Sequence, residues 1–386
     1  MGGKRLDWLA HVCKKNRIIN TAAQYLYLNV MPALFSRTEL KNRAGDSDSN
    51  GVWGRGTVRV AFVCDEMTWL DFRDCCHSLF LSPLMWREQF AQFQPQVFFC
   101  ESAWEGSMCG WPDWRGRIYR NREVFFENRK ILLEILEYCR QAGIPTVFWN
   151  KEDPPRFHQR YDFIDTALRF DWIFTTAAEC VSVYQARGHQ RVFLLPFGVN
   201  TDIFYPRTPV SEPKRILFAG SWFSDMPQRC QDMCMLFDYV LSSGMTLDIY
   251  DRKSSSGGDA FRFPERYRPY IHHSVPYERL PELFSKYEYA INVNSVTDSR
   301  TMCSRRVLQM AACGMKIISN FSPAMFEVDG LNFWKSAGDG RIFYFESDPT
   351  QIAAQYATYR QFPALLEQVL GPTAVPPEKK AGAVRL

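Results

Sequence analysis

The 386-residue sequence contains no run of 18 or more apolar residues, the length that a transmembrane helix needs, so we expect no membrane-spanning segment. The N-terminus lacks the apolar core of a signal peptide, and Leu6 stands where a myristoylation motif requires serine or threonine. The formal net charge of +4 is too small to indicate nucleic-acid binding by itself. These absences predict a cytoplasmic protein without a nucleic-acid partner, and they leave open peripheral attachment to the inner face of the membrane.

The 12 cysteines include no Cys-x-x-Cys pair. Cys75-Cys76-His77 and the pair Cys230/Cys234 lack a second pair of ligands at zinc-finger spacing. Cysteines scattered through a chain of this length favour reduced thiols in a cytosolic compartment. We therefore expect no metal site and no cofactor.

The sequence does contain two blocks in which short apolar strands alternate with helical segments. With 46% hydrophobic and 23% charged residues, the chain is long enough for two globular domains, each with its own core. In the first block we expect strands at 58–64, 96–100, 145–149, 171–175 and 191–195, and helices at 84–93, 124–142 and 177–187. In the second block we expect strands at 215–219, 246–250, 289–293, 316–319 and 342–345, and helices at 229–243, 277–286, 304–313 and from 349 to about 362. This alternation predicts an α/β fold with a parallel sheet in each domain.

The domain boundaries are predicted from turn-rich and polar segments. The N-terminal domain is expected at 53–208, the C-terminal domain at 209–347, and a final helix and frayed tail at 348–386. Residues 1–52 combine an amphipathic helical lead, from Leu6 to Phe35, with a mobile polar loop. Residues 1–50 could pack on the body of the protein or associate with a membrane or a partner enzyme, and packing is favoured because the cations are few.

Polar and basic residues follow several strands of the second block. Gly220 and Ser221 end one strand in a turn that lets the backbone approach a ligand closely, although an ordinary βα turn has the same composition. No Walker loop or Gly-x-Gly-x-x-Gly fingerprint is present. Arg305 and Arg306 open the helix expected at 304–313, where contact with a phosphate and simple solvation are about equally favoured.

Carboxylates follow the strands of the first block and are candidates for a general base. The richest group is Asn150-Lys151-Glu152-Asp153, directly after a strand, and Glu101 has Trp104 nearby as a surface for sugar stacking. For any single carboxylate, the role of a capping or solvated loop residue is the more common one. Further candidates are Asp65, Glu66 and Glu105, with His158, His272 and His273 as weaker ones.

Seven segments, in order between about Thr57 and Phe345, resemble the CgeB-like (spore-maturation-protein-like) glycosyltransferases of the GT-B fold. They are residues 100–105, 143–154, 170–180, 194–198, 218–222 and 248–252, and the stretch 301–314 with its Ala-Ala-Cys-Gly. The resemblance implies two Rossmann-like domains that face each other across a cleft, with the nucleotide-sugar donor held by the C-terminal domain and the acceptor by the N-terminal domain.

The resemblance also implies roles for individual residues. Gly220 and Ser221 would approach the donor diphosphate, and Arg305 would neutralise it. Gln309 stands where many GT-B enzymes have a ribose-binding glutamate, and Thr301 stands where the Glu-x7-Glu pattern of retaining enzymes has its first glutamate. In full, the donor-binding residues are expected to be Gly220, Ser221, Arg229, Asn294, Arg305 and Gln309, the acceptor-binding residues Trp104, Asn150 and Lys151, and the catalytic residues Glu101, Glu152 and Asp153.

The expected function is metal-independent transfer of a sugar from a nucleotide-sugar to a glycan, glycolipid or related cell-surface acceptor, as in glycan biosynthesis for the cell envelope. The alternative is a catalytically silent GT-B domain that binds a glycan or a partner, since glutamates are missing at Thr301 and Gln309. A nucleotide-sugar epimerase would share the fold, but no motif supports it.

Overall fold

The computed structural model describes residues 17–30, 52–54, 56–107, 114–154, 161–208, 214–253 and 258–372. By its internal contacts the chain divides into two compact units, the first ending at Leu195 and the second beginning at Pro196. From Tyr359 the chain belongs to the first unit again. The first unit is therefore assembled from two separate stretches of sequence.

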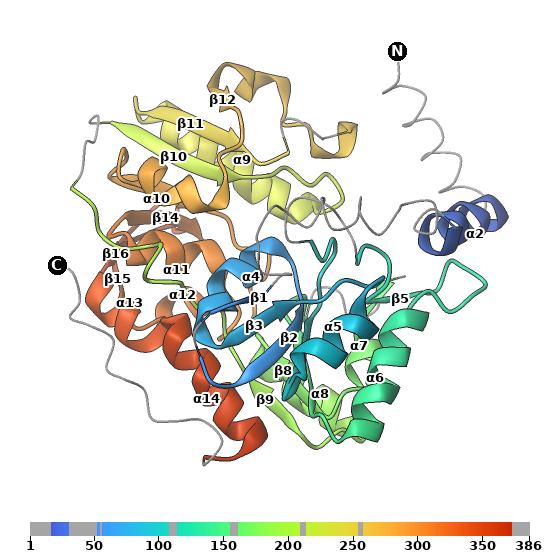
Figure 1. Cartoon of the computed structure of the whole chain (residues 1–386). Coiled ribbons are helices and arrows are strands. Elements are labelled where there is room, and N and C mark those ends of the chain that lie inside the picture. Colours follow the sequence, from blue (N-terminus) through green and yellow to red (C-terminus); the bar gives the residue numbers. More distant parts are fainter. Residues whose placement is uncertain are drawn as a thin grey trace. The chain divides into compact units, whose positions relative to one another are not determined.

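The first unit is built on a seven-stranded sheet with the strand order β1-β3-β2-β4-β6-β8-β9 (Figure 1). All neighbouring strands pair in parallel except β1, which is antiparallel to β3. The strands are β1 (Val52–Trp53), β2 (Arg59–Val63), β3 (His77–Phe80), β4 (Val97–Glu101), β6 (Thr146–Asn150), β8 (Trp172–Thr175) and β9 (Val192–Leu194). All residues of the central strands β4 and β6 are buried, as expected of a parallel sheet covered on both faces.

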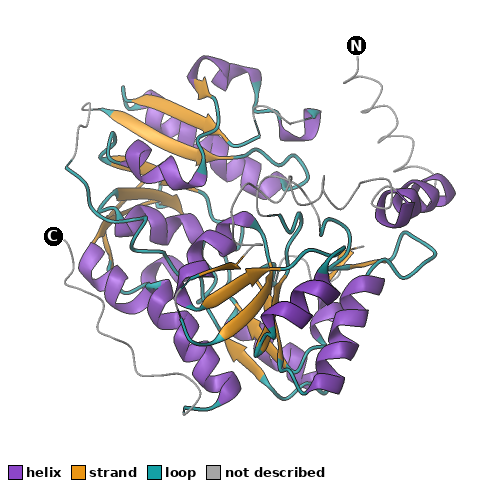
Figure 2. Ribbon diagram, viewed as in Figure 1, coloured by secondary structure: helices purple, strands orange, loops and turns teal. Residues whose placement is uncertain are grey.

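Helices pack along these strands (Figure 2). They are α4 (Glu66–Phe72), η3 (Arg73–Cys75), α5 (Trp86–Phe93), α6 (Lys130–Ala142), α7 (Phe163–Ala167), α8 (Ala178–Ala186) and α14 (Thr358–Leu370). A two-stranded ribbon joins β5 (Arg120–Asn121) to β7 (Tyr161–Asp162). The N-terminal helical extension consists of α2 (Arg17–Tyr25) and the π-helical turn η1 (Leu26–Val30).

The second unit has a seven-stranded sheet with the order β12-β11-β10-β13-β14-β16-β15. Its strands are β10 (Arg215–Gly220), β11 (Thr246–Asp251), β12 (Ile271–His272), β13 (Tyr289–Asn292), β14 (Lys316–Asn320), β15 (Leu331–Ala337) and β16 (Ile342–Ser347). The first five are parallel, while β16 runs antiparallel to β14 and β15 antiparallel to β16. Its helices are α9 (Pro227–Ser242), η4 (Asp259–Phe261), η5 (Glu265–Tyr270), η6 (Tyr277–Arg279), α10 (Leu280–Phe284), α11 (Arg305–Ala312), α12 (Ala324–Glu327) and α13 (Pro349–Tyr356).

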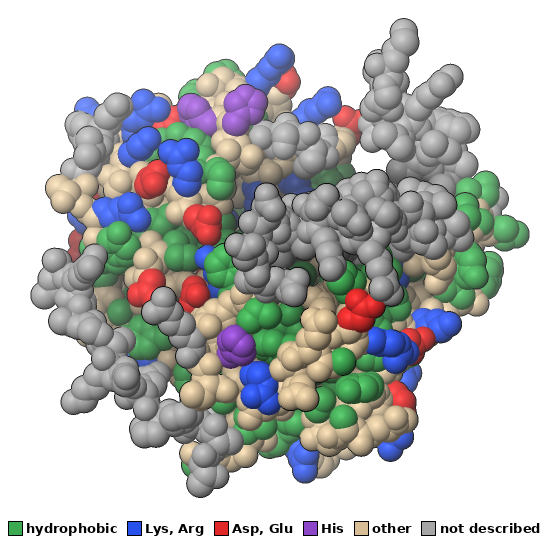
Figure 3. Space-filling model, in the orientation of Figure 1, with side chains coloured by type: hydrophobic (Ala, Val, Ile, Leu, Met, Phe, Trp, Pro, Cys, Tyr) green, Lys and Arg blue, Asp and Glu red, His purple; other side chains and the backbone are tan. Residues whose placement is uncertain are grey.

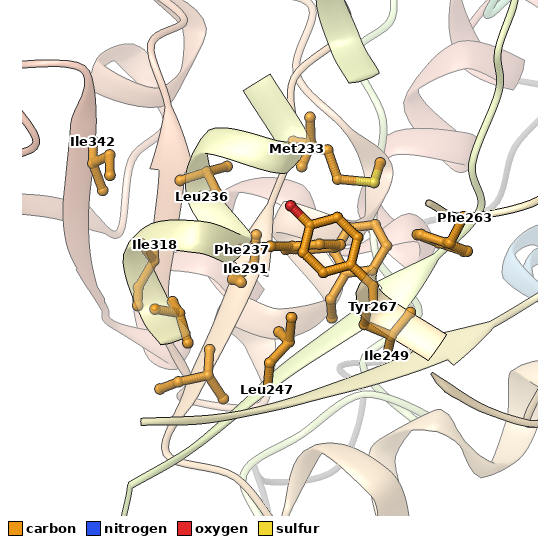
Figure 4. Packing of buried hydrophobic residues seen from close by; sticks show 14 of the residues in the cluster. Met233, Leu236, Phe237, Leu247, Ile249, Phe263, Tyr267, Ile291, Ile318 and Ile342 are labelled. Atoms are coloured by element: carbon orange, nitrogen blue, oxygen red, sulfur yellow. The ribbon is translucent and has the colours of Figure 1, made fainter. Parts of the chain in front are cut away.

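Each unit has its own apolar core. In the second unit, Met233 and Phe237 of α9 pack against Ile249 of β11, and Tyr267 completes the cluster (Figure 4). In the first unit, the rings of Phe72 and Phe99 surround Phe362 of α14, with centroid distances of 4.7 and 5.5 Å. Phe362 is fully buried, which explains why the last helix belongs to the first unit.

The expected fold class, α/β with two Rossmann-like domains, is confirmed by these two sheets. The helix predicted from residue 349 to about 362 is wrong as a single element. Its chain leaves the helical conformation at Ala357, which has ψ 129° and pairs with Val199, and α14 starts afresh at Thr358. The helix predicted over 124–142 begins only at Lys130.

Two expectations about the N-terminal lead fall partly outside the described residues. Within the lead, only residues 17–30 are described, and they are helical. The polar loop expected at 42–51 lies outside the described residues. No helix among those described has the length and apolar character to cross a bilayer. The ten described cysteines are all free.

Candidate functional site

The strand order of each sheet marks where a ligand is most easily bound. In the second unit the chain goes from β10 to β11 on one side and later reaches β13 on the other side of β10. In the first unit β2 has the same place between β3 and β4. At such switch points the loops after neighbouring strands diverge, and ligands of α/β sheets bind beyond the carboxyl ends of the strands there. Gly220 and Asn292 end the strands at one switch point, and Asp65 and Glu101 lie at the other.

Three arginines gather beyond the strand ends of the second unit. Arg229 lies on α9, Arg252 follows β11, and Arg306 lies on α11. Burial and the positive charge of Arg252 lower the pKa of Arg229 to about 10. Burial and the charges of Arg252 and Arg229 lower the pKa of Arg306 to about 10. We call these three residues the arginine cluster.

Two members of the arginine cluster, Arg229 and Arg306, hold buried positive charge. No carboxylate of the described residues forms an ion pair with Arg229 or Arg306, and the lowered pKa values come from burial and like charge. Both guanidinium groups nevertheless stay protonated at neutral pH, because a pKa of about 10 is well above it. A bound anion would relieve this repulsion and accept charge-assisted hydrogen bonds.

The loop after β10 reaches the same cluster. Arg229 Nη1 donates to the carbonyl oxygen of Ser221 at 3.0 Å, and the N–H of Arg252 donates to that of Gly220 at 3.1 Å. Ser221 is only 2% exposed, yet its hydroxyl has no hydrogen-bond partner among the described residues. A Cβ at Gly220 would come within 2.6 Å of the ring of Phe218, so a side chain there would disturb the loop. A buried hydroxyl without a partner among the described residues, in a loop that contacts Arg229, is a feature expected of a ligand site.

The predicted phosphate ligand Arg305 differs from its neighbour Arg306 in its surroundings. The guanidinium carbon of Arg305 lies 5.0 Å from the centroid of the Phe197 ring, and the residue is 9% exposed. Arg306, one position further along α11, joins the arginine cluster instead. The side chain of Ser304 makes no capping bond to the first turn of α11. Backbone N–H groups at such a helix start are available to an anion.

Gln309 and Asn294 are both buried and hydrogen-bonded within the unit. Gln309 Nε2 donates to the hydroxyl of Tyr277 at 2.8 Å. Asn294 Nδ2 donates to Ser319 Oγ at 3.0 Å, and its N–H donates to Asn320 Oδ1 at 2.7 Å. Asn294 therefore joins the ends of β13 and β14 and shapes the loops around the site. The N–H of Thr301 donates to Ser299 Oγ at 3.3 Å.

In the first unit, Lys151 links two carboxylates at the switch point. Its ammonium lies 2.9 Å from Asp65 Oδ2 and 3.0 Å from Glu101 Oε1. Glu101 is fully buried, and it also accepts from the N–H of Asp65 at 2.6 Å and from Thr68 Oγ1 at 2.5 Å. With donors on both oxygens and no exposed surface, Glu101 organises the strand ends and is poorly placed to take a proton from a substrate.

Asp65 is held in its charged form. Burial by itself would raise its pKa, but the ammonium of Lys151 and the N–H groups of Gly106 and Glu105 outweigh burial and lower the pKa to about 2. The N–H of Gly106 donates to Asp65 Oδ1 at 2.8 Å. A carboxylate with so low a pKa is a weak base, so Asp65 serves to position Lys151 and the loop at 104–106.

Asp153 differs from Asp65 because its pKa is raised rather than lowered. It is 2% exposed and accepts hydrogen bonds from Asn150 Nδ2 at 2.7 Å, Thr175 Oγ1 at 2.7 Å and the hydroxyl of Tyr184 at 3.0 Å. Burial outweighs these bonds and raises its pKa to about 7, with a further contribution from the charge of Glu152. This pKa suits proton transfer at neutral pH. Its half-buried neighbour Glu152 shares the same loop.

The remaining predicted residues of the first unit lie near this network. The ring of Trp104 packs against Tyr119 and Phe163 at centroid distances of 5.4 and 5.2 Å. Arg115 Nε donates to Glu105 at 2.6 Å. His158 lies outside the described residues. In the second unit, His272 is hydrogen-bonded to Asp248 at 2.8 Å, and His273 is exposed.

Two further observations concern ligands. Within the part of the chain that the structure describes, no three His, Cys, Asp or Glu side chains are grouped so that they could hold a metal ion. A cavity of about 710 Å³ lies in the first unit between η1 and α6, lined among others by Tyr25, Asn29, Phe126 and Glu134. This cavity lies along a helix rather than at the strand ends, so it is separate from the switch point.

Sequence reasoning missed some members of these sites. Thr175 and Tyr184, which hold Asp153, come from β8 and α8 and have no distinguishing pattern in the sequence. Arg252 lies in one of the segments that resemble CgeB-like enzymes, immediately after a predicted strand, and that position could have identified it. Arg306 was a candidate for phosphate contact together with Arg305, and only the family resemblance favoured Arg305 over it.

The two sheets and their switch points define a protein of two Rossmann-like α/β units. No protein-family model matches the sequence, and no curated protein matches it significantly. Among solved structures, the chain is similar to an alpha-glucosyltransferase in complex with UDP and a 13-mer DNA containing a central A:G mismatch. The two structures superpose with a TM-score of 0.44, and the two sequences are 9% identical. The similarity covers 68% of this chain and 78% of the glucosyltransferase chain.

The chain is also similar to a pneumococcal O-GlcNAc transferase in complex with UDP and GlcNAc. The TM-score is 0.32 and the identity 11%, over 62% of this chain and 55% of that one. At these levels of similarity, the description of the fold depends on the strand order and not on either comparison.

Proposed function

We propose that the protein is a glycosyltransferase whose second unit binds a nucleotide-sugar through its diphosphate. The observation that carries this proposal is the arginine cluster, in which Arg229, Arg252 and Arg306 are close enough to repel one another and Arg229 contacts the loop of Gly220 and Ser221. A diphosphate carries enough negative charge to occupy all three groups, and planar guanidinium groups suit phosphate oxygens. The segments that resemble CgeB-like glycosyltransferases support the same function and suggest membership of that family.

In this reaction the sugar leaves a nucleoside diphosphate, on which negative charge develops. Arg229, Arg252 and Arg306 would stabilise that charge, with the Ser221 hydroxyl and the first N–H groups of α11 as further donors. Such an arrangement would perform the transfer without a metal ion. Gln309, on the same helix α11, is hydrogen-bonded to Tyr277 of η6, and this pair would support the nucleoside part of the donor.

The first unit would bind the acceptor, a glycan, a glycolipid or a related cell-surface molecule. Its loop Asn150–Asp153 has the two carboxylates best suited to accept the proton of an acceptor hydroxyl. Glu152 is the more accessible of the two and would accept the proton, whereas Asp153, with a pKa of about 7, is buried with donors on both oxygens and would position the loop. Lys151, fixed between Asp65 and Glu101, would hold this loop in place rather than contact the sugar.

Isothermal titration with UDP, GDP and CMP tests the donor site. We expect one of these nucleotides to bind, and we expect Arg306→Ala to weaken its binding about 10- to 100-fold, as for the loss of one charge-assisted hydrogen bond. Arg300→Ala is the matched control, because Arg300 is exposed and already paired with Glu327. If none of the three nucleotides bound to the wild-type protein, the proposed function would be wrong.

A catalytically silent glycan-binding or partner-binding module is the second candidate. It is favoured by the state of the carboxylates, because Glu101 is saturated with donors and the pKa of Asp65 is about 2. Incubation with radiolabelled UDP-, GDP- and CMP-sugars separates the two candidates. Release of free sugar, even slowly, supports the enzyme, whereas binding of the donor without any turnover in the presence of acceptors supports the silent module.

A further inference from the structure

The cavity of about 710 Å³ between η1 and α6 is a built feature of the first unit. The wall formed by α2 and η1 is fixed to the body of the unit by hydrogen bonds. Arg117 Nη2, on a buried residue, donates to the carbonyl oxygen of Leu28 at 2.8 Å, and Asn121 Nδ2 donates to Gln24 Oε1 at 3.1 Å. Ligand sites usually have volumes of roughly 300–1,000 Å³, so this cavity has room for more than solvent.

Three aromatic rings line the cavity. Tyr25 of α2 meets Phe126 edge to face, with ring centroids 5.5 Å apart. Tyr138 of α6 is held by Trp86 and Phe90 of α5, whose ring centroids lie 5.7 and 5.6 Å from its own. Tyr25 is 51% exposed and Tyr138 39% exposed, so both offer uncovered ring surface to a ligand. Such surface packs well against the C–H groups on the face of a sugar ring.

Uncharged polar groups stand among these rings. Asn29 and Gln141 line the cavity with amide side chains, which both donate and accept hydrogen bonds. Asn29 Nδ2 donates to the carbonyl oxygen of Tyr25 at 3.1 Å and Gln141 Nε2 donates to Glu137 Oε1 at 2.6 Å, so each amide keeps its oxygen for a ligand. The hydroxyls of Tyr25 and Tyr138 have no hydrogen-bond partner in the part of the chain that the structure describes.

The charged side chains of the cavity wall largely neutralise one another. Each of its three carboxylates is paired with an arginine, at N–O distances of 2.9, 2.9 and 2.5 Å. The pairs are Glu127 with Arg129, Glu134 with Arg87 and Glu137 with Arg140. In Figure 3, acidic and basic side chains lie next to one another over the region of α5 and α6. A wall without a strong field of one sign favours an uncharged ligand over a cation or an anion.

We propose that this cavity binds a neutral oligosaccharide. The rings of Tyr25 and Tyr138 pack on the faces of sugar rings. The two tyrosine hydroxyls and the amides of Asn29 and Gln141 form hydrogen bonds with sugar hydroxyls, which donate and accept as these groups do. None of residues 150–153 lines the cavity, so this binding does not require the proposed transfer reaction.

Isothermal titration of the full-length protein with neutral hexasaccharides tests this proposal. The probes are maltohexaose, cellohexaose, laminarihexaose, chitohexaose and mannohexaose. We expect at least one to bind, and we expect Tyr25→Ala/Tyr138→Ala to weaken its binding at least about tenfold, because two stacking surfaces are lost. Tyr25→Phe/Tyr138→Phe should bind with an affinity between those of this variant and the wild type, since the rings stay while the hydroxyl contacts are lost.

Tyr205→Ala is the matched control, because Tyr205 belongs to the second unit and is 39% exposed, as Tyr138 is. This variant should bind the saccharide like the wild type. Circular dichroism should show that all variants are folded, since the substituted side chains are exposed. Equal saccharide binding by Tyr25→Ala/Tyr138→Ala and the wild type would overturn the proposal, because the ligand would then bind elsewhere. Absence of binding by all five probes would overturn it as well.

Nucleotide titration keeps this result separate from that for the proposed function. Tyr25→Ala/Tyr138→Ala should bind UDP, GDP or CMP as the wild type does, because both rings belong to the first unit. A wild-type protein that bound one of these nucleotides but no saccharide would contradict only the role of the cavity.

Discussion

Lys151 of the first unit is a buried cation held between two carboxylates. Its ammonium is 9% exposed and holds Glu101 and Asp65 together at the carboxyl ends of β4 and β2. The charge of Glu101 is acceptable in the protein interior only because Lys151 and two further donors satisfy it. The three residues therefore act as one unit, in which removing a single member leaves a buried charge without compensation.

We predict that Lys151→Met lowers the free energy of unfolding by about 3–5 kcal/mol, because it leaves Glu101 charged and buried without its ammonium partner. Adding Glu101→Gln to this variant should restore part of the loss, since the glutamine has no charge to compensate. Urea unfolding of the two variants and the wild type measures both effects. If the single variant were as stable as the wild type, Lys151 could not be the counter-ion of Glu101.

Asp153 makes stability depend on pH in a direction opposite to that of most carboxylates. Its pKa is raised to about 7 by burial, whereas in the unfolded chain it is close to the ordinary 3.8. Between pH 4 and 7 the folded protein thus keeps a proton that the unfolded chain has lost. The contribution of Asp153 to stability is fully present below about pH 4 and is lost as the pH rises through 7.

Relative to Asp153→Asn, we expect the wild-type free energy of unfolding to fall by up to about 1.4 kcal/mol per pH unit between pH 4 and 7. Above about pH 7 the two proteins should follow parallel curves. Urea unfolding at a series of pH values gives this difference directly. A wild-type curve parallel to that of the variant from pH 4 upwards would show that Asp153 has an ordinary pKa in the folded protein.

At the scale of elements, the final helix α14 has an effect far from its position in the sequence. Phe362 lies among Phe62, Phe72 and Phe99, with ring centroids 5.4, 4.7 and 5.5 Å away. The helix therefore fills a hole in the aromatic core of the first unit, although more than 150 residues of the second unit precede it in the chain.

We predict that Phe362→Ala destabilises the first unit by about 3–5 kcal/mol, through lost apolar contacts and the cavity that remains. Phe321→Ala is the matched control, because its ring is 48% exposed and the change should cost about 1 kcal/mol or less. Hydrogen exchange followed by mass spectrometry shows which unit is affected. Faster exchange confined to β10–β14, with β2 and β4 unchanged, would contradict the assignment of α14 to the first unit.

Most elements could be predicted from the sequence because their patterns are local. The apolar runs at 97–101 and 146–150 form buried strands, and Gly143, with φ 68°, ends α6 where a glycine was expected to stop a helix. The break at Ala357 could not be predicted, since no proline or glycine marks it. It arises from pairing with Val199, a contact between distant parts of the chain.

The candidate site was predictable to a similar extent. Ser221 and Asp153 could be identified from the sequence as candidate site residues because each follows a predicted strand. Parallel strands bring their carboxyl ends to one edge of the sheet. Their electrostatic character could not be identified, because burial and partners such as Tyr184 and Arg252 decide it. Thus Glu101 and Asp153 look equivalent in the sequence and both accept hydrogen bonds on both oxygens, but Glu101 is paired with Lys151, whereas burial raises the pKa of Asp153 to about 7.

At the scale of the whole molecule, the chain passes from the first unit to the second after Leu195 and returns at Tyr359. The second unit is therefore an insertion within the first. The chain connects the two units twice, once after Leu195 and once before Tyr359. The arginine cluster and the Asp65–Glu101–Lys151 network belong to different units. Each site can consequently be altered and measured while the core of the other unit stays intact.

The position of α14 also governs the order in which the protein can be completed during synthesis on the ribosome. The second unit is whole once Thr358 has left the exit tunnel, whereas the first unit, although translated earlier, still lacks Phe362 at that moment. The sheet of the first unit keeps an open aromatic core until α14 has been released. A nascent chain stalled before α14 would accordingly expose the rings of Phe62, Phe72 and Phe99, which makes this interval the one in which chaperone protection matters most.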